Sequence, residues 1–152
     1  GAIGIEQLKK LPNFLKHRRE NAKLFSKYFA NHPDFIMQKE IGSSSWFGFS
    51  LIIRPESKLK RADIIKLLEA NNIEYRPIAT GDFTQNEVIK YFDYEIHGEL
   101  KNAKYLQENG FFVGNHQVDI SKQIELFNKV VGGGSVAKPL TIAIYTSLQK
   151  AA

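Results

Sequence analysis

The chain has 152 residues, of which 43% are hydrophobic, and a formal net charge of +5. This length and apolar content predict one globular domain with a single core. The absence of cysteine excludes disulfides and thiolate metal sites, and the four histidines are too dispersed for a metal-ligand spacing. The basic residues are scattered, which favours anionic ligands in general and argues against nucleic acid as a partner.

The sequence contains no apolar run as long as the ~20 residues that a membrane helix needs. Its start also lacks the hydrophobic region of a signal peptide. We therefore expect a soluble, cytoplasmic protein that has no contact with membranes.

The chain begins with the apolar periodicity of a long amphipathic helix, from Ile3 to about His32. Pro12 is expected to kink or divide this helix near Leu11, because proline lacks an amide donor and clashes with the preceding turn. The basic cluster 16–19 lies between the apolar positions, which favours a solvated helix face over a binding patch.

Short strand and helix patterns alternate along the rest of the chain. The segment Ala79–Gly98 is long and aromatic, so we expect an ordered, functional loop. This order predicts an α+β fold, a two-layer α/β sandwich in which three or four short strands are covered by helices, mainly on one face. Strands are expected at Trp46–Ile53, Ile73–Ile78 and Phe111–Val113, and helices at Arg61–Asn71, Glu99–Asn109 and Asp119–Val131, the last capped by Asp119 or Ser121.

Composition divides the chain into three parts. Residues 1–131 form the expected domain, and the glycine-rich segment 132–135 is typical of a flexible linker. Residues 136–152 form a tail that contains a strand-like stretch at 140–146. This stretch could complete the sheet, begin another domain or be an engineered addition, and its role is unknown.

Two segments, Tyr75–Phe83 and Phe111–His116, are the best candidates for a shared ligand site at the ends of strands. Each is a short apolar or aromatic run that stops at glycine and then presents polar groups, which is how a strand delivers side chains to a binding rim. Arg76 suits a charge-assisted bond to a phosphate, although a surface ion pair is the alternative. The other candidates for substrate contact are Thr80, Gly81, Asp82, Phe83, Asn115 and His116, the last two of which could equally form a polar turn.

Aromatic residues could also stack on the ring of a ligand. We expect Phe47 and Phe49 to pack in the core, because a small sheet needs such residues for its interior. Trp46 and Phe83 are the aromatic residues predicted to contact substrate. No residue is assigned a catalytic or metal-binding role.

Several strings, taken in order, resemble the C-terminal small domain of pyridoxal-phosphate enzymes of the DegT/DnrJ/EryC1/StrS aminotransferase family, which has the aspartate aminotransferase fold of fold type I. The resemblance covers about residues 2–131 and is specific, because several unusual strings recur in the same order. In the family pattern we would expect Thr-Gly-Asn-Phe, whereas this chain has Asp82 in the third place. The strings lie at 2–12, 45–49, 76–78, 80–83, 91–94 and 111–116.

This resemblance implies a branch that removes the 3-hydroxyl of a nucleotide-linked 4-keto-6-deoxyhexose, with a GDP-hexose favoured, in deoxysugar (colitose) and lipopolysaccharide O-antigen biosynthesis. It also implies that pyridoxal or pyridoxamine phosphate (PLP or PMP) is held mainly by a missing large domain of a homodimeric parent enzyme. The fragment is then expected to bind no cofactor and to be inactive alone. The alternatives are the small domain of a sugar-nucleotide aminotransferase and a non-catalytic nucleotide-binding or assembly module.

Overall fold

A computed structural model describes residues 1–132 and confirms the α+β fold, in which helices accompany one small antiparallel sheet. The expected tail at 136–152 lies outside the described residues. The elements are α1 (Ala2–Phe29), β1 (Phe35–Met37), β2 (Gly48–Ile53), α2 (Arg61–Ala70), the 3₁₀ turns η1 (Phe83–Gln85) and η2 (Glu87–Tyr91), α3 (Lys101–Asn109), β3 (Gly110–Gly114) and α4 (Ser121–Val131).

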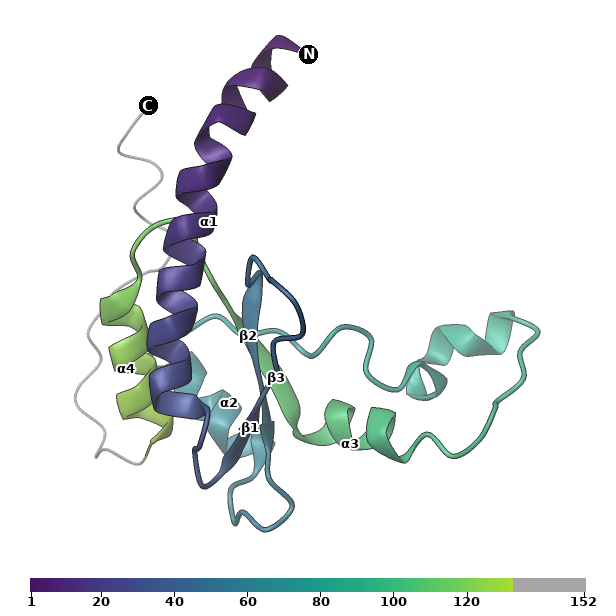
Figure 1. The fold of residues 1–152 in the computed structure, drawn as a ribbon. Helices are drawn as coiled ribbons and strands as arrows, with labels where there is room; N and C mark the ends of the chain where they lie inside the picture. Colours follow the sequence, from purple (N-terminus) through teal and green to yellow (C-terminus); the bar gives the residue numbers. More distant parts are fainter. Residues whose placement is uncertain (133–152) are drawn as a thin grey trace.

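The sheet has the strand order β1-β2-β3, and both pairings are antiparallel. Phe35 lies opposite Ile53, and Gly48 lies opposite Gly114. Figure 1 shows α1 and α4 on one side of the sheet and α3 on the other. The expectation of a sheet covered mainly on one face is confirmed, since the core cluster joins α1, α2 and α4 to alternate strand residues.

Stacked aromatic rings form the centre of the core. The ring of Phe25 lies 4.5 Å from Phe29, 4.1 Å from Phe49 and 5.7 Å from Phe127, measured between centroids. These rings come from α1, β2 and α4 and are almost fully buried. Each such ring removes a large apolar area from water, so this stack holds the helical layer on the sheet.

The strand expected at 46–53 begins two residues late. Trp46 has a φ of 52°, in the left-handed region, so the extended backbone starts only at Gly48. Trp46 is buried at 6% exposure, whereas Phe47 is 73% exposed. The prediction of a core position is thus confirmed for Phe49. It is wrong for Phe47, because the turn at Trp46 directs the Phe47 side chain outward.

Two further strand predictions need correction. The segment Ile73–Ile78 makes only an isolated antiparallel bridge between Arg76 and Phe112, because Pro77 lacks the amide donor that a longer ladder needs. β1 was missed, since three residues after the turn at Pro33 are too few to show an alternating pattern.

Helix boundaries differ in smaller ways. α1 is not divided at Pro12 and continues to Phe29. α4 begins at Ser121, and its N-cap residue is Ile120 without a side-chain cap. Asp119 instead accepts the amide of Ser121 at 2.8 Å, which is the short-range turn typical of aspartate.

The expected loop forms a projecting arm, which we define as residues 79–100. Figure 1 shows it extending away from the sheet on the side of α3. Two side-chain caps order it, since Asp82 accepts the amide of Thr84 at 3.0 Å and Asn86 accepts that of Val88 at 3.1 Å. The arm is therefore built by local turns, with Ile89 as its buried anchor.

None of the helices in residues 1–132 combines the length and the hydropathy required to span a bilayer. Over the same residues, no group of three histidine, aspartate or glutamate side chains is arranged to hold a metal ion.

His32 predicts a pH dependence of stability. Its ring packs 5.5 Å from Phe29 and 5.0 Å from Phe35, and burial lowers its pKa below the ordinary value of 6.5. The unfolded chain therefore binds this proton more readily, so stability should fall as pH drops from about 7 through 6.5 to the lower folded pKa.

Urea unfolding at several pH values measures this effect. His32→Asn is the matched variant, because its side-chain oxygen can replace the ring nitrogen that accepts the amide of Asp34 at 3.1 Å. The variant should lose less stability than the wild type over this pH window. An equal loss in both proteins would remove His32 as the cause.

Candidate functional site

A cavity of about 350 Å³ opens between α1, α4, β3 and the segment 73–76. Its inner wall is apolar and is formed largely by core aromatics, whereas charged and polar groups stand at positions 74, 76, 115, 116 and 123. This combination of an apolar wall and few polar groups is typical of ligand sites. The lining residues that the argument uses are Phe47, Glu74, Arg76, Asn115, His116 and Gln123.

Arg76 is fixed by its backbone, and its exposed tip is paired with Glu74. Its amide donates to the carbonyl of Phe112 at 2.9 Å, and its carbonyl accepts the amide of Phe112 at 2.8 Å. The exposed guanidinium donates to Glu74 at 2.5 Å. The backbone pairing thus places a cation at the cavity, where Glu74 is its partner.

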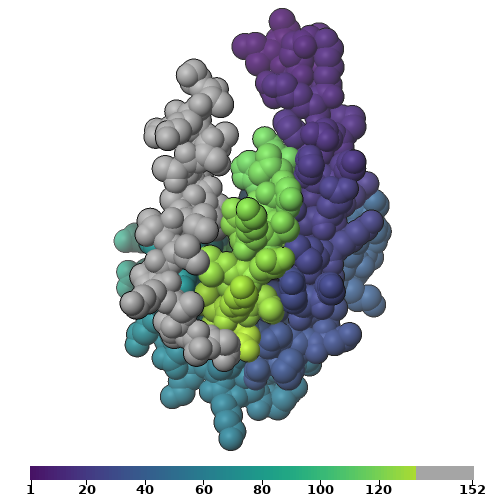
Figure 2. Space-filling model, turned by 90° about the vertical axis from the view of Figure 1, so that its left-hand side faces the viewer, coloured from purple at the N-terminus to yellow at the C-terminus, as the bar shows by residue number. Residues whose placement is uncertain are grey.

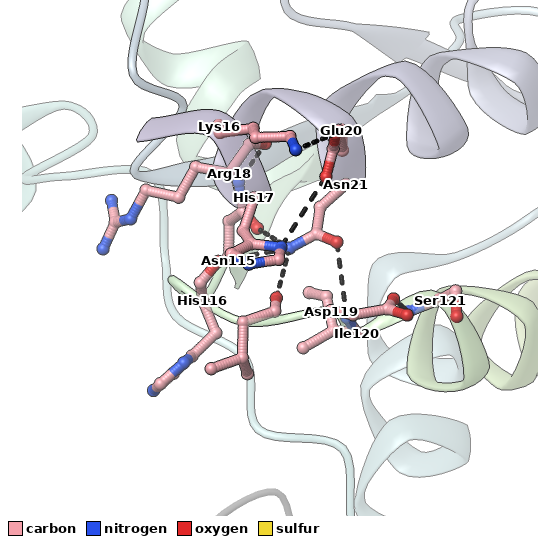
Figure 3. A network of polar contacts seen from close by, with 11 residues as sticks. Lys16, His17, Arg18, Glu20, Asn21, Asn115, His116, Asp119, Ile120 and Ser121 are labelled. Atoms are coloured by element: carbon pink, nitrogen blue, oxygen red, sulfur yellow. Dashed lines mark hydrogen bonds and ion pairs between the residues drawn. The ribbon is translucent and has the colours of Figure 1, made fainter. Parts of the chain in front are cut away.

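His116 lines the same cavity from the other strand end. Its Nδ1 is buried and has no hydrogen-bond partner among the described residues. Figure 3 shows its side chain directed away from the network formed by Asn21 and Asn115. A polar atom left without a partner costs free energy unless a ligand or water satisfies it, so His116 can accept or donate a hydrogen bond to a bound molecule.

Asn115 is buried at 7% exposure, and its amide is fully used within the chain. Its Nδ2 donates to the carbonyls of Arg18 at 3.0 Å and Trp46 at 2.9 Å, while its Oδ1 accepts Nδ2 of Asn21 at 3.0 Å. These bonds join α1 to Trp46 and Asn115, on the two chain segments that flank the cavity. Figure 3 shows the part of this network that links α1 to Asn115. The geometry gives Asn115 a positioning role beside His116.

The remaining predicted residues lie elsewhere. Gly81 has a φ of 58° and packs so closely on Gln107 that an added Cβ would lie 2.8 Å from its Oε1. Asp82 is buried at 4% exposure, and its Oδ1 accepts both the amide and the hydroxyl of Thr84. The expected family pattern has asparagine at this position, and an asparagine Oδ1 could accept the same two bonds. Aspartate can therefore form the same turn as asparagine here.

The structure thus brings together Arg76, Asn115 and His116, and it places Thr80–Phe83 at the base of the arm, outside the cavity lining. Trp46 lies beneath the surface. Phe83 is 43% exposed and could reach a ligand from the arm. Substrate contact by any of these residues stays a prediction.

Comparison with known proteins decides the family. Residues 1–122 match the model of the DegT/DnrJ/EryC1/StrS aminotransferase family. The chain belongs to this family.

The family member "GDP-4-keto-6-deoxy-D-mannose 3-dehydratase" of Yersinia pseudotuberculosis is 55% identical over 130 residues, which is 84% of this chain and 33% of that protein. The solved structure of the E. coli enzyme of that name, with bound hydrated PLP, superposes with a TM-score of 0.81 at 50% identity and covers 85% of this chain and 33% of that one. The solved structure of a mutant GDP-4-keto-6-deoxymannose-3-dehydratase with bound GDP-perosamine has a TM-score of 0.80 at 49% identity, covering 85% of this chain and 34% of the other. The chain therefore spans about a third of the length of these relatives.

The described residues do not fit a complete site for pyridoxal phosphate. Every lysine in residues 1–132 is exposed, and none lines the cavity. The carboxylate at the cavity, Glu74, is paired with Arg76 instead of being free for a pyridine nitrogen. A cofactor aldehyde held as a Schiff base needs a placed amine, and no lysine of residues 1–132 lines the cavity to supply one.

Sequence reasoning missed Asn21, Glu74 and Gln123. Asn21 falls within the apolar periodicity of α1, and a polar residue at a helix position that faces the core was the available signal. Glu74 stands two residues before Arg76 in an extended segment, so both side chains were bound to share a face. Nothing in the sequence separates Gln123 from other polar residues of α4.

We predict that Asn21→Leu lowers the free energy of unfolding by at least about 2 kcal/mol. Leucine fills a similar volume but leaves the carbonyls of His116 and Val118 and the amide of Ile120 without their partner. Urea unfolding measures the loss, and Asn102→Leu on the exposed face of α3 is the control, expected to change little. Equal stabilities of wild type and Asn21→Leu would contradict a structural role for the network.

Proposed function

We propose that residues 1–131 are the small, substrate-contacting domain of a pyridoxal-phosphate-dependent enzyme that removes the 3-hydroxyl of GDP-4-keto-6-deoxy-D-mannose. The observation that carries the proposal is the 55% identity to a 3-dehydratase over 130 residues, together with a cavity that gathers Arg76 and His116. In this proposal, residues 132–135 link the domain to the tail at residues 136–152.

Arg76 would bind an anionic or hydroxyl oxygen of the sugar nucleotide. A guanidinium forms strong, charge-assisted bonds with phosphate, and its backbone pairing with Phe112 fixes where it can reach. Binding would require that Glu74 release it, because one exposed arginine tip cannot serve both partners in the same geometry. Glu74 would therefore tune the affinity for the substrate.

His116 would contribute the second contact, through the buried Nδ1 that lacks a partner within the described chain. Asn21 and Asn115 would act indirectly, by holding the backbone on either side of His116. The cofactor would supply the electron sink for the elimination and would be held by protein outside this chain. The fragment alone would then have no activity.

The closest alternative is the small domain of a sugar-nucleotide aminotransferase. Its support is the family itself, which is named for aminotransferases. The two reactions differ in the residue that meets the cofactor, a lysine in the aminotransferase and a histidine in its place in the dehydratase, and that residue would lie in the missing domain. A non-catalytic nucleotide-binding or assembly module is the second alternative. Arg76 at the cavity supports it as well as it supports an enzyme, because a guanidinium can bind the phosphates of a nucleotide in either case.

We also propose that the whole enzyme is a homodimer whose large domain covers the cavity face. Phe47 supports this, since a ring that is 73% exposed beside an apolar cavity would be shielded by a neighbouring domain. The guanidinium carbon of Arg18 lies 5.9 Å from this ring centroid, and their cation–π contact would stand at the same boundary.

The test uses the full-length enzyme that contains this chain, assayed for 3-deoxysugar formation from GDP-4-keto-6-deoxy-D-mannose. Arg76→Ala should raise KM about 10- to 100-fold, the value of one charge-assisted hydrogen bond of about 1.5–3 kcal/mol. Lys66→Ala, which removes an exposed cation of α2 away from the cavity, should leave KM unchanged.

Each outcome has a distinct meaning. Unchanged KM and kcat in Arg76→Ala would remove this residue from the substrate site. Formation of an amino sugar from glutamate, without the 3-deoxy product, would replace the dehydratase by the aminotransferase. Binding of GDP by a protein without either activity would favour the non-catalytic module.

A further inference from the structure

We propose that Gln107, on the last turn of α3, is a positioning residue for the substrate site. It fixes residues 76–82, which we define as the entry segment, because this stretch leads from the cavity into the arm. Gln107 itself does not line the cavity. Figure 2 shows α1 and α4 side by side on one face, whereas Figure 1 shows α3 on the other side of the sheet. The inference deepens the proposed function and rests on it for the effect on substrate binding.

The entry segment follows β3 and then α3 in antiparallel order. Arg76 pairs with Phe112 through two backbone hydrogen bonds. Ile78 packs so closely on Gly110 that a Cβ added to this glycine would lie 2.6 Å from the Cδ1 of Ile78. As the segment advances from 76 to 78, its partner thus recedes from 112 to 110, and the same order brings its last residues to Gln107.

Gln107 holds the end of the entry segment by a hydrogen bond and by packing. Its Oε1 accepts the backbone amide of Asp82 at 2.7 Å. Gly81 has a φ of 58° and lies against the same side chain, so that an added Cβ would stand 2.9 Å from the Cβ of Gln107. Glycine meets both requirements, since it tolerates a positive φ and permits close approach. Gly81 and Asp82 therefore serve the contact with Gln107.

The hydrogen bond satisfies a buried amide. Asp82 is 4% exposed, and within the described residues its amide donates to Gln107 alone. The side chain of Asp82 is engaged separately, since its Oδ1 accepts the amide and the hydroxyl of Thr84. Loss of the Gln107 acceptor would leave an unpaired donor away from water, which costs free energy unless the segment shifts to expose it. The bond therefore favours one position of the entry segment over displaced ones.

Few other contacts hold the entry segment. The pairing of Arg76 with Phe112 is an isolated bridge, which lacks the neighbouring pairs of a longer ladder. The 3₁₀ turns of the arm beyond it contact mainly each other. In contrast, α3 is tied to the sheet, because the hydroxyl of Tyr105 donates to the carbonyl of Ile53 at 2.8 Å. Gln107 therefore fixes the entry segment relative to the sheet.

The entry segment joins two residues that are predicted to contact substrate. Arg76 begins it, and Phe83 follows directly after its end. A segment released from Gln107 would let both side chains sample more positions, so substrate binding would cost more conformational entropy. The chemical step takes place at the cofactor, which is held outside this chain in the proposed function. Loss of the Gln107 contact should therefore raise KM and leave kcat unchanged.

The experiment uses the full-length enzyme that contains this chain. Gln107→Met keeps the length of the side chain and removes its acceptor. Gln107→Glu combined with Asp82→Asn restores an acceptor oxygen without bringing two carboxylates together, since asparagine can form the turn to Thr84. Glu108→Met, at the next and likewise exposed position of α3, is the control. Hydrogen exchange followed by mass spectrometry reports on the entry segment, and 3-deoxysugar formation gives KM and kcat.

Amides in peptides that cover residues 76–91 should exchange about 2- to 10-fold faster in Gln107→Met, which is the effect of losing one hydrogen bond. KM should rise by about the same factor at unchanged kcat. The paired variant, with its restored acceptor, should return both values to those of the wild type, which a role of side-chain volume alone would not do. Glu108→Met should match the wild type in both measurements.

Other outcomes overturn the proposal. Unchanged exchange in Gln107→Met shows that other contacts hold the entry segment. Faster exchange with unchanged KM shows that Gln107 has no positioning role for substrate. No recovery in the paired variant shows that the acceptor oxygen is not the cause. A wild-type enzyme that forms no 3-deoxysugar refutes the proposed function and the substrate role together, whereas the exchange result still decides whether Gln107 holds the segment.

Discussion

The amide pair of Asn21 and Asn115 is the interaction on which the cavity depends. It connects residues 94 positions apart, one on α1 and the other after β3. Through Trp46 it also holds the turn that leads into β2. Because these amides are buried, a lost partner would leave unpaired groups away from water, so the three segments are held in one arrangement. The position of His116 follows from that arrangement.

The turn at Trp46 shows how this network shapes the surface. A bulky residue with a φ of 52° is unfavourable by itself, and it persists where surrounding contacts determine it. Here the carbonyl of Trp46 accepts Nδ2 of Asn115, and its ring lies in the core. The next residue, Phe47, is consequently turned outward to the cavity. The buried side-chain amide of Asn115 thus accounts both for the strained backbone at Trp46 and for the exposed ring of Phe47.

Sequence patterns predicted the helices and the two longer strands because those signals are local and periodic. The spacing of Phe25 and Phe29, for example, is enough to identify the buried side of α1. The candidate site was only partly predictable. Arg76 and His116 could be named from strand ends, but Asn21 acts through partners almost a hundred residues away, and no local rule connects them. The outward turn of Phe47 likewise depends on tertiary contacts.

Charge is distributed unevenly between α1 and the arm, which the overall composition does not show. A net charge of +5 suggests a mildly basic protein, yet α1 holds most of the excess and the arm is acidic. The arm also has few contacts with the body, so neither burial nor salt bridges to the core explain its aromatic residues. Selection for folding alone would favour polar residues there. Exposed rings on an ordered, charged arm are better explained by contact with another surface than by the folding of this domain.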